Sequence, residues 1–217
     1  MREDIKIKAR PEDEVINAVI EREWSMFDKV QNIGGCRASC QDDEWTFYAN
    51  RYSQFSALSQ ETVFSYYNDL TRAIEDGRNV ITEKYAYMME FTDPEYYHRE
   101  LEASLPAVPA ENMELVHQIV EIQLRQEKAF RARFPYFAGR GRVLDNDESS
   151  FTSFKVYSIG ELKTYSYDTL KLFLRDIKLT DREAELSLSY RIHLNTARFY
   201  GYKTLDDAEN ALREGRR

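Results

Sequence analysis

A carboxylate on the apolar face of the first predicted helix is the feature that most constrains the fold of this chain. Helical periodicity runs through Pro11–Gln31, where one stripe of residues recurs at spacings of four and three. The stripe consists of Ile16, Ile20, Glu23, Phe27 and Val30. An unpaired charge is costly to bury. Glu23 therefore requires a cationic side chain, a ligand or a metal beside it in the interior.

The same conflict recurs in Asn79–Phe91, a predicted helix with apolar residues on nearly every side. Glu83, Lys84 and Glu90 lie there among Val, Ile, Tyr and Met residues. Since each of these charges needs a partner if it is buried, we expect charged side chains from several helices to meet in one polar pocket.

Composition favours a folded, mainly α-helical protein. Eight glycines and five prolines in 217 residues leave few turns, and fifteen tyrosines with twelve phenylalanines supply large side chains for a core. A chain of this length fits one domain. We expect a single-domain multi-helix bundle over residues 1–217, with an N-terminal extension over 1–10 and a loop over 135–150.

Start and stop signals divide the chain into predicted elements. Ser59 is a favourable N-cap, and Gly77 is a favourable terminator of the same helix. The segment Phe151–Ile159 alternates weakly, which predicts a short strand or extended segment. Helices are expected over Pro11–Gln31, Glu44–Leu58, Ser59–Asp76, Asn79–Phe91, Pro94–Ser104, Glu111–Phe134, from Gly160 to Ile177, Asp181–Tyr200 and Leu205–Glu214.

Charge and hydropathy disfavour several classes of partner. Thirty Lys and Arg residues against 38 Asp and Glu give a net charge of −8, and no segment concentrates basic residues as nucleic-acid binding requires. No stretch approaches the roughly 18 apolar residues of a membrane span, and the charged start lacks the apolar core of a signal peptide. We expect a cytoplasmic protein that binds neither nucleic acid nor membrane, and we allow for a homodimer.

Arg51 is a candidate ligand-binding residue on the second predicted helix. It lies with Gln54 in a polar cluster between aromatic residues, and a guanidinium can bind a carboxylate or phosphate at two points. The alternative is an internal ion pair with Glu23 or Glu83.

Lys84 is a candidate base or imine-forming amine, because burial in an apolar helix lowers the pKa of an ammonium group. The adjacent Glu83 opposes this role, since a nearby anion keeps the ammonium charged.

Two further segments contain candidate functional residues. Glu161 and Tyr165 lie one helical turn apart, an arrangement that suits proton transfer but also a structural hydrogen-bond cluster. Arg140 lies in Gly139–Arg142, where two cations beside glycines suit an anion-binding lid or a solvated loop neutralised by Asp145–Glu148.

The sequence evidence for a metal site or a cofactor is weaker. Glu95/His98 and Glu114/His117 have the Glu-x-x-His spacing of di-iron bundles, but they are only nineteen residues apart across two prolines. Cys36 and Cys40 lack the second pair that a structural zinc site needs, which favours reduced thiols. The chain contains no P-loop, dinucleotide, serine-hydrolase or zinc-protease motif. We therefore expect no cofactor and no metal.

Motifs along nearly the whole chain resemble those of one bacterial family. They are Glu23-Trp24, Asn32, Arg37–Gln41, Arg51, Ser53-Gln54, Ser65–Leu70, Asn79, Glu83–Glu90, Gly139-Arg140, Thr152-Ser153, Tyr157, Gly160–Leu162, Thr164–Ser166, Thr169-Leu170, Asn195-Thr196 and Tyr200–Tyr202. In these segments the chain is similar to the family described as domain of unknown function 4125. The chain departs from that pattern in reading Gly141-Arg142 after Gly139-Arg140. The resemblance implies a shared fold and a shared pocket, and it implies no reaction.

We expect an enzyme that acts on a small polar, anionic metabolite by cofactor-free acid–base chemistry, of lyase, isomerase or hydrolase type. The expected catalytic residues are Glu23, Lys84, Glu161 and Tyr165. The expected substrate-binding residues are Arg37, Arg51, Gln54, Asp69, Glu83, Glu90, Arg140 and Tyr157. Three alternatives stay open: a non-catalytic binding or regulatory module, a carboxylate-bridged metal protein, and a purely structural set of ion pairs.

Overall fold

The computed structural model describes residues 13–31, 35, 37–145 and 152–215, and within these ranges the chain is helical without a strand. The described α-helices are α1 (Asp13–Phe27), α2 (Glu44–Phe55), α3 (Gln60–Glu75), α4 (Val80–Thr92), α5 (Pro94–Tyr96), α6 (Ala110–Arg133), α7 (Pro135–Ala138), α8 (Phe154–Leu162), α9 (Tyr167–Thr180), α10 (Leu188–Phe199) and α11 (Leu205–Arg213). Shorter 3-10 or π turns are η1 (Ser39–Asp42), η2 (Tyr97–Leu101), η3 (Glu102–Ser104) and η4 (Ala184–Leu186). The predicted mainly α fold is confirmed.

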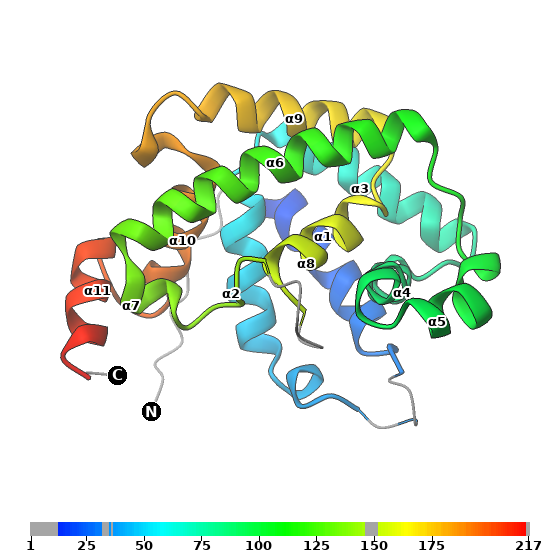
Figure 1. Ribbon diagram of the computed structural model, residues 1–217, viewed down its shortest axis with the longest axis horizontal. Coiled ribbons are helices and arrows are strands. Elements are labelled where there is room, and N and C mark those ends of the chain that lie inside the picture. The colour runs from blue at the N-terminus through cyan, green and yellow to red at the C-terminus, as the bar shows by residue number, and fades with distance from the viewer. Residues whose placement is uncertain (1–12, 32–34, 36, 146–151, 216–217) are drawn as a thin grey trace.

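The longest described helix, α6, crosses the molecule and organises its neighbours (Figure 1). Helix α9 runs beside α6, while α8 packs against both α6 and α4. Helix α1 packs on α2, α3 and α4, and α10 packs on α2 and α6. Helices α7, α10 and α11 gather at one end of the molecule. Helix α8 therefore lies at the centre, among helices distant from it in sequence.

Two groups of buried apolar side chains lie along α6. The larger group joins α1, α2, α3, α4, α6, α8 and α9, and the smaller group joins the end of α6 to α7, α10 and α11. The most buried members of the larger group include Val19, Leu70, Ile119, Leu170 and Ile177. Burial of such side chains is the main favourable term in folding. The expectation of a single domain stays a prediction, and the extension expected over 1–10 lies outside the described residues.

Side-chain caps define where several helices begin. The Ser59 hydroxyl accepts a hydrogen bond from the Thr62 amide at 3.3 Å, as expected from the sequence. The Asn79 carboxamide oxygen accepts from the Ile81 and Thr82 amides at 3.1 and 3.0 Å. These caps satisfy amide groups that have no partner within the helix.

The strand or extended segment expected over Phe151–Ile159 is wrong from residue 154 onward, where α8 begins; Phe151 itself lies outside the described residues. Aromatic and β-branched residues favour a strand locally, but the Ser153 hydroxyl caps a helix by accepting from the Val156 amide at 3.2 Å. Packing of that helix against α4 then overrides the local preference.

Three other boundaries differ from expectation. The helix expected from Gly160 to Ile177 is interrupted over residues 163–166, because Ser166 caps a new helix, α9. The helix expected over Asp181–Tyr200 begins only at Leu188, after η4. The loop expected over 135–150 starts with the short helix α7, whose first amides donate to the Glu209 carboxylate at 2.9 and 2.7 Å; residues 146–150 lie outside the described residues.

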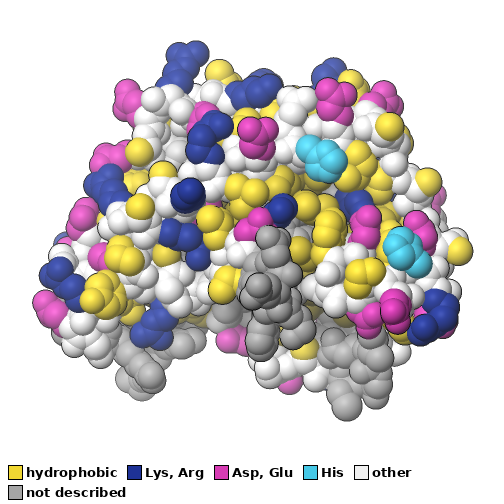
Figure 2. Space-filling model, in the orientation of Figure 1, with side chains coloured by type: hydrophobic (Ala, Val, Ile, Leu, Met, Phe, Trp, Pro, Cys, Tyr) yellow, Lys and Arg dark blue, Asp and Glu magenta, His cyan; other side chains and the backbone are white. Residues whose placement is uncertain are grey.

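The surface mixes charges of both signs. On the face shown in Figure 2, Lys and Arg side chains are interspersed with Asp and Glu, and hydrophobic side chains are exposed below α6. No helix among residues 13–31, 35, 37–145 and 152–215 is long and apolar enough to cross a membrane.

The close contact between α8 and α4 depends on Gly160. A Cβ atom at this position would lie 2.5 Å from Met88 Cγ and 2.8 Å from the Lys84 carbonyl oxygen. We expect Gly160→Ala to lower the free energy of unfolding by about 1–3 kcal/mol through overpacking, despite the better helix propensity of Ala. The control Gly141→Ala places its Cβ at an ordinary 3.5 Å from the Ala138 carbonyl oxygen. Urea denaturation of both variants checks this, and equal stability would contradict it.

Candidate functional site

Arg51 is the centre of a buried ionic network. Its Nε donates to Glu23 Oε2 at 2.7 Å, and its Nη2 donates to Glu23 Oε1 at 2.5 Å. Its Nη1 donates to both Glu161 carboxylate oxygens at 3.1 Å. All three residues are buried, and Glu23 is fully so. The guanidinium thus joins two carboxylates from α1 and α8 in the bidentate manner that favours Arg in such sites.

Lys84 completes the charge balance of the network. Its Nζ donates to Glu161 Oε2 at 2.5 Å, so two cations face two carboxylates in the interior. Tyr66 donates to Glu23 at 2.8 Å, and Tyr165 donates to Glu161 at 3.1 Å. Each buried charge therefore has opposite charge and hydrogen bonds around it, which is what burial of ions requires.

Gln54 connects the two halves of the network. Its carboxamide oxygen accepts from Arg51 Nη1 at 2.8 Å, and its nitrogen donates to Glu161 Oε1 at 2.7 Å. The structure shows that Glu23, Arg51, Lys84 and Glu161 meet in the interior, as expected. That these four residues line a ligand pocket stays a prediction. Gln54 and Tyr165, both predicted around them, also belong to the network.

Electrostatic interactions keep Glu161 and Lys84 in their ionic forms. Burial alone would raise the pKa of Glu161, but Arg51 and Lys84 outweigh it and hold that pKa well below its usual range. Burial alone would lower the pKa of Lys84, yet Glu161 raises it above the ordinary value. Burial raises the pKa of Tyr165, and the Glu161 charge adds to this effect. At neutral pH the carboxylate is a weak base, and the ammonium and phenol are weak acids.

These pKa shifts bear on the expected catalytic roles. A general base or acid works best with a pKa near the operating pH, whereas the pKa values of Lys84, Glu161 and Tyr165 are all shifted away from it. Glu23 already accepts three hydrogen bonds from Arg51 and Tyr66. The proton-transfer roles of these four residues stay predictions, and the geometry of the network does not favour them.

Tyr157 extends the network towards the surface. The Lys84 Nζ lies 3.6 Å from the centre of the Tyr157 ring, and the Arg142 guanidinium carbon lies 4.6 Å from it. Cation–π attraction therefore places one buried and one exposed cation on the same ring. Arg142 was expected only as part of a basic loop, and its neighbour Asp145 pairs with Lys155 at 2.9 Å.

Arg37, Arg140 and Glu83 do not join the network, contrary to the expected grouping. Arg37 is exposed and pairs with Asp28 at 2.9 Å and Asp42 at 3.2 Å. Arg140 is exposed beyond the end of α7. Glu83 pairs with Arg78 at 2.7 Å. Consecutive helical residues point about 100° apart, so Glu83 and Lys84 face different neighbours.

Asp69 and Glu90 also lie apart from the network. The Asp69 carboxylate accepts from the Ser166 amide at 3.0 Å and from the Thr169 hydroxyl at 2.6 Å, which fixes the start of α9. Glu90 forms an ion pair with Lys163 in the turn between α8 and α9. Both acids therefore hold the turn over residues 163–166 in place.

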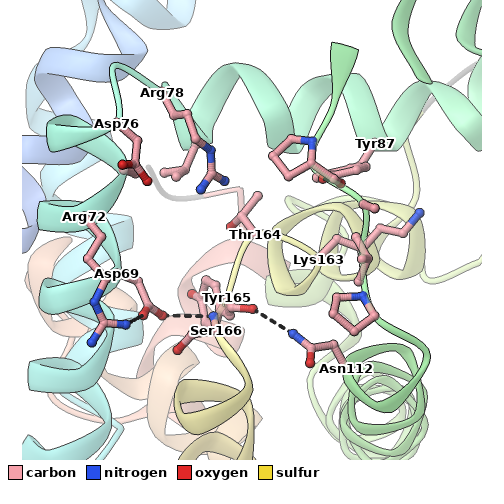
Figure 3. Close-up of a pocket in the computed structure, with 16 residues that line it drawn as sticks. Asp69, Arg72, Asp76, Arg78, Tyr87, Asn112, Lys163, Thr164, Tyr165 and Ser166 are labelled. Carbon is pink, nitrogen blue, oxygen red and sulfur yellow. Dashed lines mark hydrogen bonds and ion pairs between the residues drawn. The ribbon is translucent and has the colours of Figure 1, made fainter. Parts of the chain in front are cut away.

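This turn forms one wall of a pocket of about 230 Å³, shown in Figure 3 and called here the charged pocket. Its other walls are the end of α3, the start of α4 and the segment before α6. The lining residues are Asp69, Arg72, Ala73, Asp76, Arg78, Val80, Tyr87, Pro106, Ala107, Val108, Pro109, Asn112, Lys163, Thr164, Tyr165 and Ser166.

Tyr165 connects the charged pocket to the network. The residue lines the pocket, where its carbonyl oxygen accepts from the Asn112 amide group at 3.5 Å, and its hydroxyl reaches Glu161 on the other side. The sequence pointed to Asp69 and Tyr165 but missed Arg72, Asp76, Arg78 and Lys163. Arg78 carried a recoverable signal, because the buried acid Glu83 required a cation. Lys163 pairs with Glu90, an acid on the otherwise apolar α4 that is only partly buried.

The metal alternative finds no support in the described ranges. His98 pairs with Glu102 at 2.9 Å instead of Glu95, and His117 is exposed. Across the described part of the chain, no group of three or more His, Cys, Asp or Glu side chains is arranged to hold a metal ion. Cys40 is an exposed free thiol, and Cys36 lies outside the described residues.

Comparison with known protein families gives a match over most of the chain. The family described as "Protein of unknown function (DUF4125)" matches residues 13–210, which include the network and the charged pocket. No curated protein and no solved structure matches.

Removing Arg51 should destabilise the protein strongly, because two buried carboxylates would lose their shared cation. We expect Arg51→Ala to lower the free energy of unfolding by about 3–5 kcal/mol. The matched control is Arg37→Ala, which removes the exposed ion pairs with Asp28 and Asp42 and should leave the urea midpoint close to that of the wild type. Similar midpoints for the two variants would contradict a role of the network in stability.

Stability should also depend on the ionisation of Glu161. Because its pKa is lower in the folded state than in the unfolded chain, its contribution is fully present above the unfolded value of about 4.3 and is lost as pH falls through the folded value. The difference in unfolding free energy between the wild type and Glu161→Gln should therefore shrink progressively below about pH 4.3. Urea titrations at several pH values measure it, and a constant or growing difference would contradict the assignment.

Proposed function

The chain belongs to the DUF4125 family, and we propose that it is a binding protein whose charged pocket takes a small charged metabolite. The observation that carries the proposal is a concavity lined by both cationic and anionic side chains, set against the buried ionic network. Ligand sites are commonly concave, with an apolar lining and a few convergent polar groups.

The size of the pocket limits the ligand. A volume of about 230 Å³ is smaller than the roughly 300–1,000 Å³ of typical small-molecule sites. A metabolite of a few carbons fits such a space. This agrees with the small polar ligand expected from the sequence.

In this proposal the network supports the wall of the pocket. Arg51 and Lys84 hold the Glu161 carboxylate in place. Tyr165, which belongs to the turn over residues 163–166, donates a hydrogen bond to that carboxylate, so the turn is held in place as well. A preorganised wall binds with less loss of conformational entropy. The expected acid–base reaction is not part of the proposal, since the shifted pKa values oppose it.

Filling the pocket should abolish binding. Ala107 lines the pocket and is exposed, so Ala107→Trp should block it with little effect on the core. The control is Ala103→Trp, at an exposed position of η3 that does not line the pocket. A library of small charged metabolites, screened by thermal shift and titration calorimetry, should contain a compound that stabilises the wild type and the control. A ligand at 100 times its Kd stabilises by about 2.7 kcal/mol.

The stabilisation should disappear in Ala107→Trp. Equal binding to Ala107→Trp, or no binding by any charged metabolite in the library, would overturn the proposal.

A further inference from the structure

The segment before α8 places Arg142 on a tyrosine of that helix. The Val143 carbonyl oxygen accepts a hydrogen bond from the Phe154 amide at 2.8 Å, which ties this segment to the start of α8. The Arg142 guanidinium carbon lies 4.6 Å from the centre of the Tyr157 ring. The buried Lys84 ammonium lies 3.6 Å from the centre of the same ring. Both cations therefore contact Tyr157, and none of these residues lines the charged pocket.

Tyr85 on α4 brings a second phenol to this group. Helices α4 and α8 pack against each other (Figure 1). Burial raises the pKa of Tyr85, and the groups that then act on that pKa belong to Tyr157, Lys84, Cys40 and Arg142. Charges act on a pKa in this way only at short range. The Tyr85 hydroxyl therefore lies in the same region as Tyr157 and Arg142.

Three donor groups in this region are uncommitted. In the described ranges the hydroxyls of Tyr85 and Tyr157 make no hydrogen bond, and the Arg142 guanidinium makes no hydrogen bond or ion pair. A guanidinium has five N–H donors, and each phenol has one O–H donor. Arg142 is exposed and both tyrosines are half-buried, so a ligand can reach all three side chains.

The uncommitted charge of this region is positive. Lys84 is already paired with Glu161 at 2.5 Å. Asp145, the acid that follows Arg142 in the same segment, pairs with Lys155 at 2.9 Å. Neither acid therefore neutralises Arg142, which supplies a free cation beside the two phenols.

This set of donors suits an oxyanion, and a phosphate group in particular. A guanidinium binds two oxygens of a carboxylate or a phosphate. A carboxylate then has no further oxygen for the phenols, whereas a phosphate group has at least three acceptor oxygens. A phosphate group can therefore accept hydrogen bonds from the guanidinium and from a phenol through different oxygens.

We infer that Tyr85, Arg142 and Tyr157 form a second ligand site, called here the arginine–tyrosine site, which binds a phosphate group. The guanidinium binds two phosphate oxygens, and the phenol hydroxyls donate to the remaining acceptor positions. The basic segment Gly139–Arg142 thus has the anion-binding role that the sequence allowed, with Arg142 in place of Arg140. The arginine–tyrosine site shares no residue with the charged pocket, so the inference goes beyond the proposed function.

Titration calorimetry with inorganic phosphate, methyl phosphate and acetate tests the ligand class. We expect both phosphates to bind the wild-type protein. Acetate should bind at least about tenfold more weakly, as loss of one charge-assisted hydrogen bond implies. Binding of only one of the two phosphates supports the inference and distinguishes the free ion from a monoester. No binding by either phosphate, or equal affinity of acetate, would overturn it.

Three variants test the assigned residues. Arg142→Gln should weaken phosphate binding at least about tenfold. Tyr85→Phe and Tyr157→Phe keep the rings and remove only the hydroxyls, and each should weaken binding roughly fivefold. Urea midpoints close to that of the wild type show that the variants are folded.

The matched control is Arg140→Gln, which removes the same charge from an exposed position two residues away. It should change the affinity for phosphate by less than about twofold, because a charge outside the site acts only through screened solvent. Equal losses in Arg140→Gln and Arg142→Gln, or unchanged affinity in both Phe variants, would contradict the assigned site.

Ala107→Trp separates the inference from the proposed function. This variant fills the charged pocket and should leave phosphate binding unchanged. Loss of phosphate binding in Ala107→Trp would place the ion in the charged pocket, which overturns the inference and leaves the proposed function standing. If phosphate binds as expected and Ala107→Trp abolishes the binding of no metabolite, the proposed function is wrong and the inference stands.

Discussion

The guanidinium of Arg51 is the interaction on which the rest of the structure depends. It joins Glu23, which precedes it by 28 residues, to Glu161, which follows it by 110 residues. With Lys84 on α4, this contact ties four helices together in the interior. Buried ion pairs are weak evidence of net stabilisation, but breaking one is costly because a charge is left unpaired. We therefore infer that the network fixes how α1, α2, α4 and α8 are arranged relative to one another.

The same network bears on which part of the molecule could bind a ligand. Its charges neutralise one another, and the pKa values of Glu161 and Lys84 are both shifted away from neutrality. Other charged side chains, among them Asp76, Arg72 and Arg78, line the charged pocket on the far side of Tyr165. Because Tyr165 contacts Glu161 and also lines the pocket, the buried ions position the wall that a ligand would touch.

The helical fold and the inward charges could be predicted from the sequence, because both follow from the spacing of apolar and charged residues along each helix. Glu23 in an apolar stripe and Ser59 as a cap are local signals of this kind. The partners of the charges were harder to predict, since the Glu90–Lys163 pair spans 73 residues and depends on how α4 meets α8. Helix α8 was missed because its aromatic and β-branched residues favour a strand until packing on α4 is taken into account. Glu83 and Lys84 were grouped as neighbours although a helix turns them towards different partners.

The central claim is that Glu161 remains an ionised carboxylate inside a closed set of ion pairs. Carbon-13 NMR of the glutamate side-chain carboxyl carbons, followed between pH 3 and pH 8 in the folded protein, observes this ionisation directly. The account predicts that the Glu161 signal stays at its ionised position down to a pH below the ordinary glutamate value of about 4.3. A Glu161 signal that titrates between about pH 5 and pH 7 would contradict it, and would return this carboxylate to the role of a proton carrier.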